Sequence, residues 1–284
     1  MAKLKIYQHP EKHEKRWQSM IKPLFDKNGA NRKFLDLGCN EGFYMKKAIK
    51  HGYRAAGIEK ESFYIDRADD SLNIIQGDVN YQEFGCYNLV LMSHVHYWQS
   101  DEQVEALFHL LRYATPKLIV SGKHHRRSTK TNPSYEHLKN VLKGWKLAKE
   151  VRRGRYYSAL FTSTVIKEFD VDMLYESTYE WIMKLKHMFH FMTSFEDFVK
   201  RSLDDINFDP KGCDFAEYLR LIKGKPHYHL GRCWIYKTLI EDLKANGPNA
   251  PLVVVNGRLR DGFHRLIILK ELGYKRVVCR LNKR

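Results

Sequence analysis

The sequence lacks the patterns that mark membrane-spanning, secreted and disulfide-rich proteins. None of its 284 residues belongs to an apolar run of about 18, the length that a transmembrane helix needs. The N-terminal residues, Met-Ala-Lys-Leu-Lys-Ile, do not open a long apolar segment, which argues against a secretory signal. The five cysteines are odd in number and form no Cys-x-x-Cys pair, so neither a disulfide framework nor a cysteine-rich metal site is expected. We therefore predict a protein of the reducing cytoplasm.

Acidic residues are also in short supply. The chain carries 33 Asp and Glu against 49 Lys and Arg, which gives a net charge of +16, and both halves share the excess. The most basic stretch, residues 117–155, has 12 basic and two acidic residues. Such a stretch is typical of a patch that binds the phosphates of nucleic acid, of a nucleotide-linked sugar or of a lipid head group, and equally of a solvated face. The charge therefore leaves nucleic acid open as a partner.

Apolar strand patterns alternate with amphipathic helix patterns through the first 165 residues. This alternation favours a parallel, doubly wound sheet, so the predicted fold class is α/β with a Rossmann-like sheet of seven strands. The last two strands are predicted to form an antiparallel hairpin. Strands are predicted at 33–37, 53–58, 72–76, 87–93, 117–121, 144–147 and 155–164, and helices at 10–28, 43–51, 61–69 and 101–113.

The chain changes character after residue 165. Residues 166–212 are rich in Met, Phe, Tyr and acidic residues and are predicted to form a helical connector. A second, small α+β domain is predicted over 213–284, and the first domain over 1–165. The second domain has predicted helices at 214–222, 233–246 and 262–272 and strands at 252–255, 258–260 and 275–281.

Polar residues follow each of the first three predicted strands. The first strand ends in Asp36-Leu37-Gly38-Cys39-Asn40-Glu41-Gly42, where glycine lets a ligand approach the backbone closely. Glu59 ends the second strand, where a carboxylate can accept hydrogen bonds from both hydroxyls of a ribose. Asp78 and Val79 follow the third strand, where a carboxylate and the backbone can bind an adenine edge. Parallel strands share one carboxyl edge, so these groups are predicted to bind one nucleoside-like ligand.

This arrangement resembles that of class I S-adenosylmethionine-dependent methyltransferases over about residues 30–165. The first motif of that family is a strand ending in Asp/Glu-x-Gly-x-Gly-x-Gly, and here Asn40 stands at the middle glycine position. The alternative, a dinucleotide-binding Rossmann domain, is disfavoured by seven strands with a closing hairpin. The resemblance implies S-adenosylmethionine as cofactor, with its methionine part held by Asp36, Gly38 and Gly42 and by Asn40 in the same turn, its ribose by Glu59 and its adenine by Asp78 and Val79.

Two histidines follow the fourth strand, in Ser93-His94-Val95-His96. In the family this edge faces the methyl acceptor, so His94 or His96 is predicted to deprotonate an acceptor hydroxyl, because imidazole titrates near neutrality. The alternative is that one of them packs in the core. No Asn/Asp-Pro-Pro-Tyr/Phe and no Pro-Cys follows, which disfavours methylation of DNA amines and of cytosine C5. The resemblance therefore favours an oxygen acceptor on a small molecule, a glycan or a phosphorylated compound.

A second motif, Asp261-Gly262-Phe263-His264-Arg265, follows a hairpin whose turn is Asn256-Gly257 and opens a helix. A helix N-terminus attracts anions and arginine binds phosphate in a bidentate manner, whereas Asp261 is also an ordinary N-cap. The string resembles the ParB/sulfiredoxin-like nucleotide-binding fold. That resemblance implies that Asp261, Gly262, His264 and Arg265 hold nucleotide phosphates, of ATP or CTP with Mg²⁺. Phe263 stands where sulfiredoxin has its cysteine, so sulfinic-acid reduction is not expected.

Together, the two motifs predict a bifunctional enzyme. The first domain is expected to be an O-methyltransferase and the second a nucleotide-binding, kinase-like domain. The alternative is a nucleic-acid-binding or nucleic-acid-modifying protein, which the net charge and the ParB-like motif favour. A binding module without catalysis is a third hypothesis, and the presence of all the acidic residues of the first motif argues against it.

Overall fold

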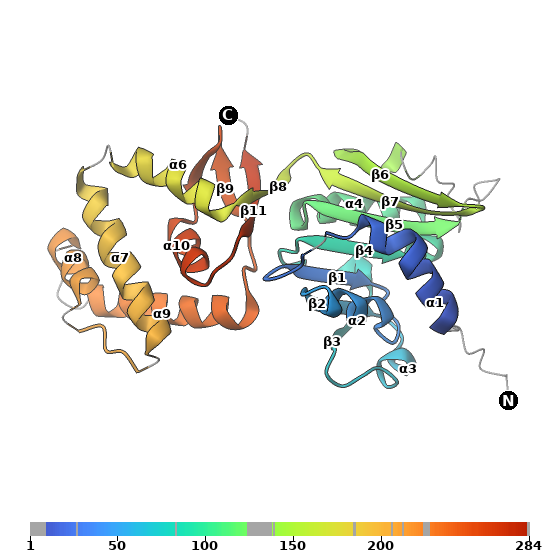
Figure 1. The fold of residues 1–284 in the computed structure, drawn as a ribbon, viewed down its shortest axis with the longest axis horizontal. Helices are drawn as coiled ribbons and strands as arrows, with labels where there is room; N and C mark the ends of the chain where they lie inside the picture. The colour runs from blue at the N-terminus through green and yellow to red at the C-terminus, as the bar shows by residue number, and fades with distance from the viewer. Residues whose placement is uncertain are drawn as a thin grey trace. The chain divides into compact units, whose positions relative to one another are not determined.

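The computed structural model describes residues 10–26, 28–82, 84–123, 138, 140–183, 186–205, 207–211, 213–223 and 228–282. The chain forms two compact units, Met1–Lys167 and Glu168–Arg284, here called unit 1 and unit 2 (Figure 1). Residues 168–212, predicted to belong to a separate connector, are part of unit 2. Within the described residues, no helix combines the length and the apolar character needed to cross a membrane.

Unit 1 is built on a seven-stranded sheet of order β3-β2-β1-β4-β5-β7-β6, which confirms the predicted α/β class and the strand number. β1 to β5 are parallel, and β7 runs antiparallel to both β5 and β6. The strands are β1 Lys33–Leu37, β2 Arg54–Glu59, β3 Asn73–Gln76, β4 Leu89–Ser93, β5 Lys117–Lys123, β6 Trp145–Arg153 and β7 Tyr156–Ser163. The strand order reverses between β1 and β4, and the carboxyl edge of a sheet at such a point is where ligands bind in open α/β folds.

The helices of unit 1 depart from prediction in two places. The helix predicted over 10–28 is divided into α1 Pro10–Arg16, a π-helical turn Trp17–Ile21 and a 3₁₀ turn Lys22–Leu24. The helix predicted over 61–69 is a single turn that ends at Ile65. Further along, Asp69 accepts hydrogen bonds from the backbone and hydroxyl of Ser71, which favours a turn there. The helices of this unit include α2 Phe43–Lys50, α3 Ser62–Ile65 and α4 Asp101–Ala114.

Two apolar layers cover the two faces of this sheet. One layer contains Phe108 and Leu111 of α4, and the other contains Trp17 of the π-helical turn and Tyr44 of α2. Strand residues alternate between the layers, as a period of two requires. The strands contribute Leu35, Val90 and Val120 to the α4 layer and Phe34, Leu91 and Ile119 to the α2 layer.

This alternation fixes which polar side chains share a face. Asp36, Ser93 and Lys123 stand an even number of residues from Phe34, Leu91 and Ile119 in their own strands, so they lie on the α2 face. All three are at or near the carboxyl ends of their strands.

Unit 2 has a four-stranded sheet of order β10-β9-β11-β8. β8, Ile166–Asp170, was predicted to be helical, but Asp170 accepts a hydrogen bond from the backbone of Met173 and so caps the helix that starts at Val171. The hairpin and helix of the second motif are present as β9, β10 and α10. The other elements are β9 Leu252–Val255, β10 Arg258–Asp261, β11 Arg276–Asn282, α6 Val171–Met183, α7 Lys186–Asp204, α8 Asp214–Lys223, α9 Tyr228–Asn246 and α10 Phe263–Glu271.

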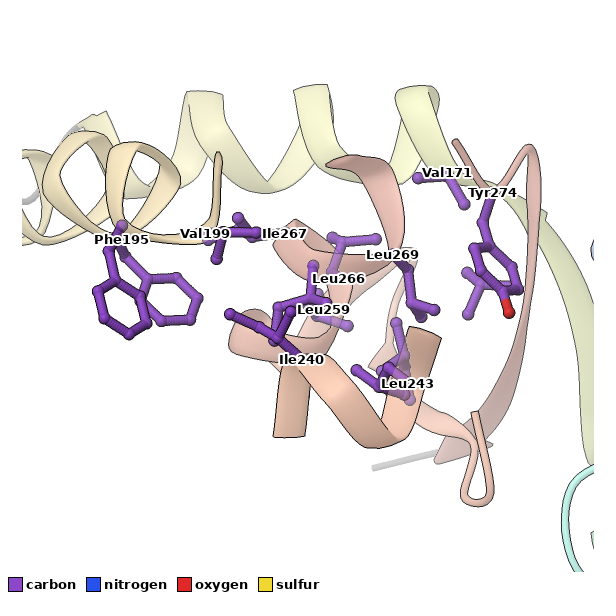
Figure 2. Packing of buried hydrophobic residues seen from close by; sticks show 14 of the residues in the cluster. Val171, Phe195, Val199, Ile240, Leu243, Leu259, Leu266, Ile267, Leu269 and Tyr274 are labelled. Atoms are coloured by element: carbon purple, nitrogen blue, oxygen red, sulfur yellow. The ribbon is translucent and has the colours of Figure 1, made fainter. Parts of the chain in front are cut away.

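The core of unit 2 explains why residues 168–212 are not a connector. Figure 2 shows Val171 of α6 and Phe195 and Val199 of α7 in one buried cluster with Ile240 of α9 and Ile267 of α10. Helices that supply the core cannot be separated from the sheet that they cover.

Two isoleucines of α9 provide a matched test of this core. Ile240 is 2% exposed and Ile235 is 57% exposed. We expect Ile240→Ala to lower the free energy of unfolding by about 2–5 kcal/mol, since it leaves a cavity, and Ile235→Ala to change it by less than about 0.5 kcal/mol. Urea unfolding followed by circular dichroism measures both, and equal effects would contradict the packing described here.

Candidate active site

The turn after β1 is held in an unusual backbone conformation. Gly38, Asn40 and Gly42 have φ angles of 66°, 50° and 77°. Glycine enters this left-handed region freely, and asparagine is among the few other residues that tolerate it. Asn40 also donates from Nδ2 to the carbonyl of Gly38 at 3.2 Å. Asparagine at the middle glycine position therefore preserves the backbone path of the motif.

Glu59 connects this turn to β2. Its side chain is 6% exposed, Oε2 accepts the N–H of Asn40 at 2.8 Å, and Oε1 accepts the N–H of Glu61 at 3.0 Å. A carboxylate oxygen can accept two hydrogen bonds, so each oxygen keeps one acceptor position for a ligand. The two positions suit a pair of adjacent hydroxyl groups.

Asp36 is a buried carboxylate that lacks a hydrogen-bond partner at one oxygen. The residue is 1% exposed, and Oδ2 has no partner among the described residues. Burial raises the pKa of this carboxyl well above its ordinary value, and the carboxylate of Glu59 raises it further. A ligand that brings a positive charge or a hydrogen-bond donor would stabilise Asp36 at this place.

The third predicted group lies next to Glu59. The N–H of Gly77 donates to the carbonyl of Glu59 at 2.8 Å, which places Asp78 beside the end of β2. Oδ1 of Asp78 accepts the N–H of Asn80 at 3.0 Å and Oδ2 accepts Lys60 Nζ at 3.1 Å, and these contacts lower the pKa of Asp78, the Asn80 bond most. Val79 is buried and begins a short 3₁₀ turn. The predicted residues from Asp36 to Val79 therefore meet at neighbouring strand ends.

His94 follows β4 at the same edge. Its φ of 67° is left-handed, and its N–H donates to the carbonyl of Ser121 at 2.9 Å. A Cβ on Gly38 would overlap the side chain of Val95, so this turn packs directly on the turn after β1. Burial lowers the pKa of His94 to about 3, with smaller contributions from Arg16, His96, Lys123 and His13. The imidazole is therefore neutral near pH 7, the form that accepts a proton.

His96, two residues further along the chain, is fully buried. It is 0% exposed, and its Nε2 is 3.1 Å from the hydroxyl of Tyr157. The catalytic role considered for His96 stays a prediction, and the burial of its ring gives it less access to a substrate than the edge of the sheet would offer. The turn that carries His94 packs on the turn after β1.

Three residues that no motif of the sequence indicated, Arg16, Lys123 and Tyr156, lie together close to His94. The guanidinium carbon of Arg16 and the Nζ of Lys123 lie 5.5 and 5.4 Å from the ring centroid of Tyr156. The alternation of strand residues could have placed Lys123 on the face of Asp36, because Lys123 and Asp36 each stand an even number of residues from the apolar residues that line that face. No local signal indicates that the end of α1 reaches β7, so Arg16 could not be found in this way.

The side chains of the second motif contact other residues of unit 2. Nη1 of Arg265 donates to the carbonyl of Ala250 at 2.9 Å, and Nη2 is 3.8 Å from Oδ2 of Asp261. His264 stacks on Tyr236 with centroids 4.4 Å apart, and its Nε2 lies 2.9 Å from the Tyr236 hydroxyl. Burial lowers the pKa of His264 to about 4.

An open cavity of about 560 Å³ lies beside this motif, and Gly262, which begins α10, is part of its lining. In the described residues, no three His, Cys, Asp or Glu side chains come together as a metal site. Nucleotide binding by Asp261, Gly262, His264 and Arg265 therefore stays a prediction. The cavity is lined by Tyr236, Leu239, Asp261, Gly262, Phe263, His264 and Arg265.

Comparison with known proteins gives structural matches only. A scan against protein-family models finds no match, and a search of curated proteins finds none either. The PH0226 protein from Pyrococcus horikoshii OT3 is 14% identical, with 54% of this chain and 92% of that chain covered and a TM-score of 0.47.

Two other matched structures are described as S-adenosylmethionine-dependent methyltransferases. A TehB-like enzyme from Corynebacterium glutamicum is 17% identical, with 55% of this chain and 98% of that chain covered and a TM-score of 0.42. An enzyme from Mesorhizobium loti is 15% identical, with 52% of this chain and 97% of that chain covered and a TM-score of 0.44. The matched part amounts to about half of this chain.

Asp36 and Asp69 are expected to respond oppositely to pH. The pKa of Asp36 is raised, so its ionisation destabilises the fold as pH rises above 3.8. Hydrogen bonds from Ser71 lower the pKa of Asp69 to about 2, so the stability that these bonds add is lost as pH falls below 3.8. Asp36→Asn should therefore raise the midpoint of thermal unfolding at pH 7, and Asp69→Asn should lower it slightly. The Asp36→Asn difference should shrink as pH falls toward the ordinary aspartate pKa of 3.8, whereas the Asp69→Asn difference should shrink only as pH falls from 3.8 toward 2. An Asp36→Asn protein that is less stable at pH 7 would refute the assignment.

Proposed function

We propose that unit 1 is an S-adenosylmethionine-dependent methyltransferase that acts on an oxygen acceptor. The observation that carries the proposal is the meeting of Asp36, Glu59 and Asp78 at three neighbouring strand ends, around a turn with three left-handed residues. The strand order with its reversed β7 supports the same reading, because it provides a parallel carboxyl edge at the switch between β1 and β4.

The residues present fit this cofactor. The two remaining acceptor positions of Glu59 suit the ribose hydroxyls, and the unpartnered oxygen of Asp36 suits a cationic amino group. The carboxylate of Asp78 suits an adenine amino group, and its contact with the exposed Lys60 is one that a ligand can replace. Bound S-adenosylmethionine would supply a methyl group already activated for transfer.

His94 provides the base. The turn that carries His94 packs on the turn after β1 through Val95, and burial keeps the imidazole neutral. A neutral ring can accept the proton that an acceptor hydroxyl loses when its oxygen forms a new bond to carbon. The left-handed backbone of His94 is unfavourable for a residue with a Cβ, and such strain is concentrated at functional positions. These features favour His94 over the buried His96 in this role.

Glu59 and Glu61 offer a matched test of cofactor binding. We expect Glu59→Gln to weaken binding of S-adenosylmethionine about 10- to 100-fold, because a charged acceptor of the ribose hydroxyls is lost. Glu61→Gln removes the same charge from an exposed side chain and should leave the affinity unchanged. Isothermal titration calorimetry measures both. Absence of binding by the unaltered protein, or equal effects of the two substitutions while both variants stay folded by circular dichroism, would contradict the proposal.

A second substitution separates binding from transfer. His94→Asn keeps a residue that tolerates the left-handed backbone, so the fold and the affinity for S-adenosylmethionine should be retained. Transfer of a tritiated methyl group to hydroxylated acceptors should fall about 10²–10⁴-fold. An unchanged rate would exclude His94 as the base.

We assign unit 2 no activity of its own. His264 and Arg265 form contacts within the unit, with Tyr236 and with the carbonyl of Ala250. A kinase-like activity with ATP or CTP and Mg²⁺ stays a prediction from the sequence, as does the nucleic-acid alternative.

A further inference from the structure

Three side chains from three elements meet at the carboxyl edge of β5, and we call Arg16, Lys123 and Tyr156 the cationic cluster. Lys123 ends β5 and Tyr156 begins β7, and the two are partners in the strand register. Arg16 ends α1, and the π-helical turn that follows it contacts β7. The two cations lie 5.5 and 5.4 Å from the centroid of the same ring.

The cationic cluster lies beside His94. Ser93 and Ser121 are register partners in β4 and β5, and the N–H of His94 bonds to the carbonyl of Ser121. Lys123 follows two residues later, on the same face of the sheet as Asp36 and Ser93. Both Arg16 and Lys123 lower the pKa of His94, which agrees with this proximity.

Glu14 and Glu150, the acidic residues nearest in sequence to Arg16 and to Tyr156, have partners of their own. Glu150 is the one acid between residues 145 and 156, and it binds Arg152 with an Oε1–Nε distance of 2.6 Å. Glu14, on the same helix as Arg16, binds Lys47 at 2.5 Å. Arg153, the register partner of Tyr156 in β6, is exposed and adds a further positive charge. Arg16, Lys123 and Arg153 thus bring three positive charges to this part of unit 1.

Two cations at one aromatic ring repel each other, and an anion bound beside them offsets that repulsion. Arginine offers a planar fork of donors for phosphate or carboxylate oxygens, lysine adds a point charge, and the ring orients both. A neutral acceptor would leave the repulsion in place.

We propose that the cationic cluster binds the anionic group, a phosphate or a carboxylate, of the methyl acceptor while the acceptor hydroxyl faces His94. The inference rests on the proposed methyltransferase function and gives it a substrate class, the hydroxylated anion. Neutralising Arg16 and Lys123 would also raise the proton affinity of His94. The base would thus become stronger when the acceptor is in place.

The test compares ligands that differ in charge. Phenyl phosphate, benzoate and the neutral phenyl β-D-glucoside are titrated calorimetrically into the full-length protein. At least one anion should bind about tenfold or more tightly than the glucoside, and Arg16→Gln or Lys123→Gln should remove that preference. Arg16→Lys should restore part of it. Lys146→Gln makes the same charge change at an exposed residue of β6 and should have no effect.

Titration of the same variants with S-adenosylmethionine separates this inference from the proposed function. Unchanged cofactor affinity in Arg16→Gln and Lys123→Gln, together with loss of anion binding, supports the acceptor site. Weaker cofactor binding with unchanged anion binding would assign the cations to the carboxylate of S-adenosylmethionine and overturn the inference. Equal affinity for the anions and the glucoside would also overturn it. Anion binding that depends on Arg16 in a protein that does not bind S-adenosylmethionine would uphold the anion site and refute the methyltransferase.

Discussion

Glu59 is the residue on which the candidate site of unit 1 depends. Its two carboxylate oxygens accept the N–H groups of Asn40 and Glu61, and its carbonyl accepts the N–H of Gly77. One residue thus fixes the turn after β1, the start of the loop after β2 and the loop after β3. A buried carboxylate is stable only when such donors surround it, so the fold and the ligand site share the same hydrogen bonds.

The sheet supplies the second constraint, because its geometry decides which side chains can meet. The chain leaves β1 toward β2 on one side and β4 lies on the other, which separates the loops above the switch point. The period of two then selects the α2 face for Asp36, Ser93 and Lys123. The acidic residues Asp36, Glu59 and Asp78 lie at the ends of β1 to β3, and the basic residues Lys123 and Arg153 lie at the ends of β5 and β6. The carboxyl edge of the sheet therefore has an acidic part and a basic part.

The sequence predicted those parts of the site that depend on local patterns. Asp36, Glu59 and Asp78 each follow a strand, and the position of a residue after a strand is a local property. Apolar patterns also indicated the strands of the first sheet. The sequence patterns did not show that Asp170 caps α6, so the strand β8 before it was predicted as helix. Burial of His96 and the approach of Arg16 to Tyr156 depend on packing between distant segments, which no local pattern records. The resemblance of residues 213–284 to a nucleotide-binding fold described a hairpin and a helix that are present, but not the contacts that occupy Arg265.

The backbone of His94 has a consequence for the evolution and engineering of this protein. Among the described residues, four that are not glycine have a left-handed backbone, namely Asn31, Asn40, Asn256 and His94. Three of them are asparagine, which relieves the strain with its own side chain or turn. Selection for thermal stability alone would favour asparagine or glycine at position 94 as well, because either would remove strain of about 1 kcal/mol or more. Under the proposed role of His94 as the base, stability and methyl transfer would be opposed at a single residue, and selection for heat resistance alone would remove that base.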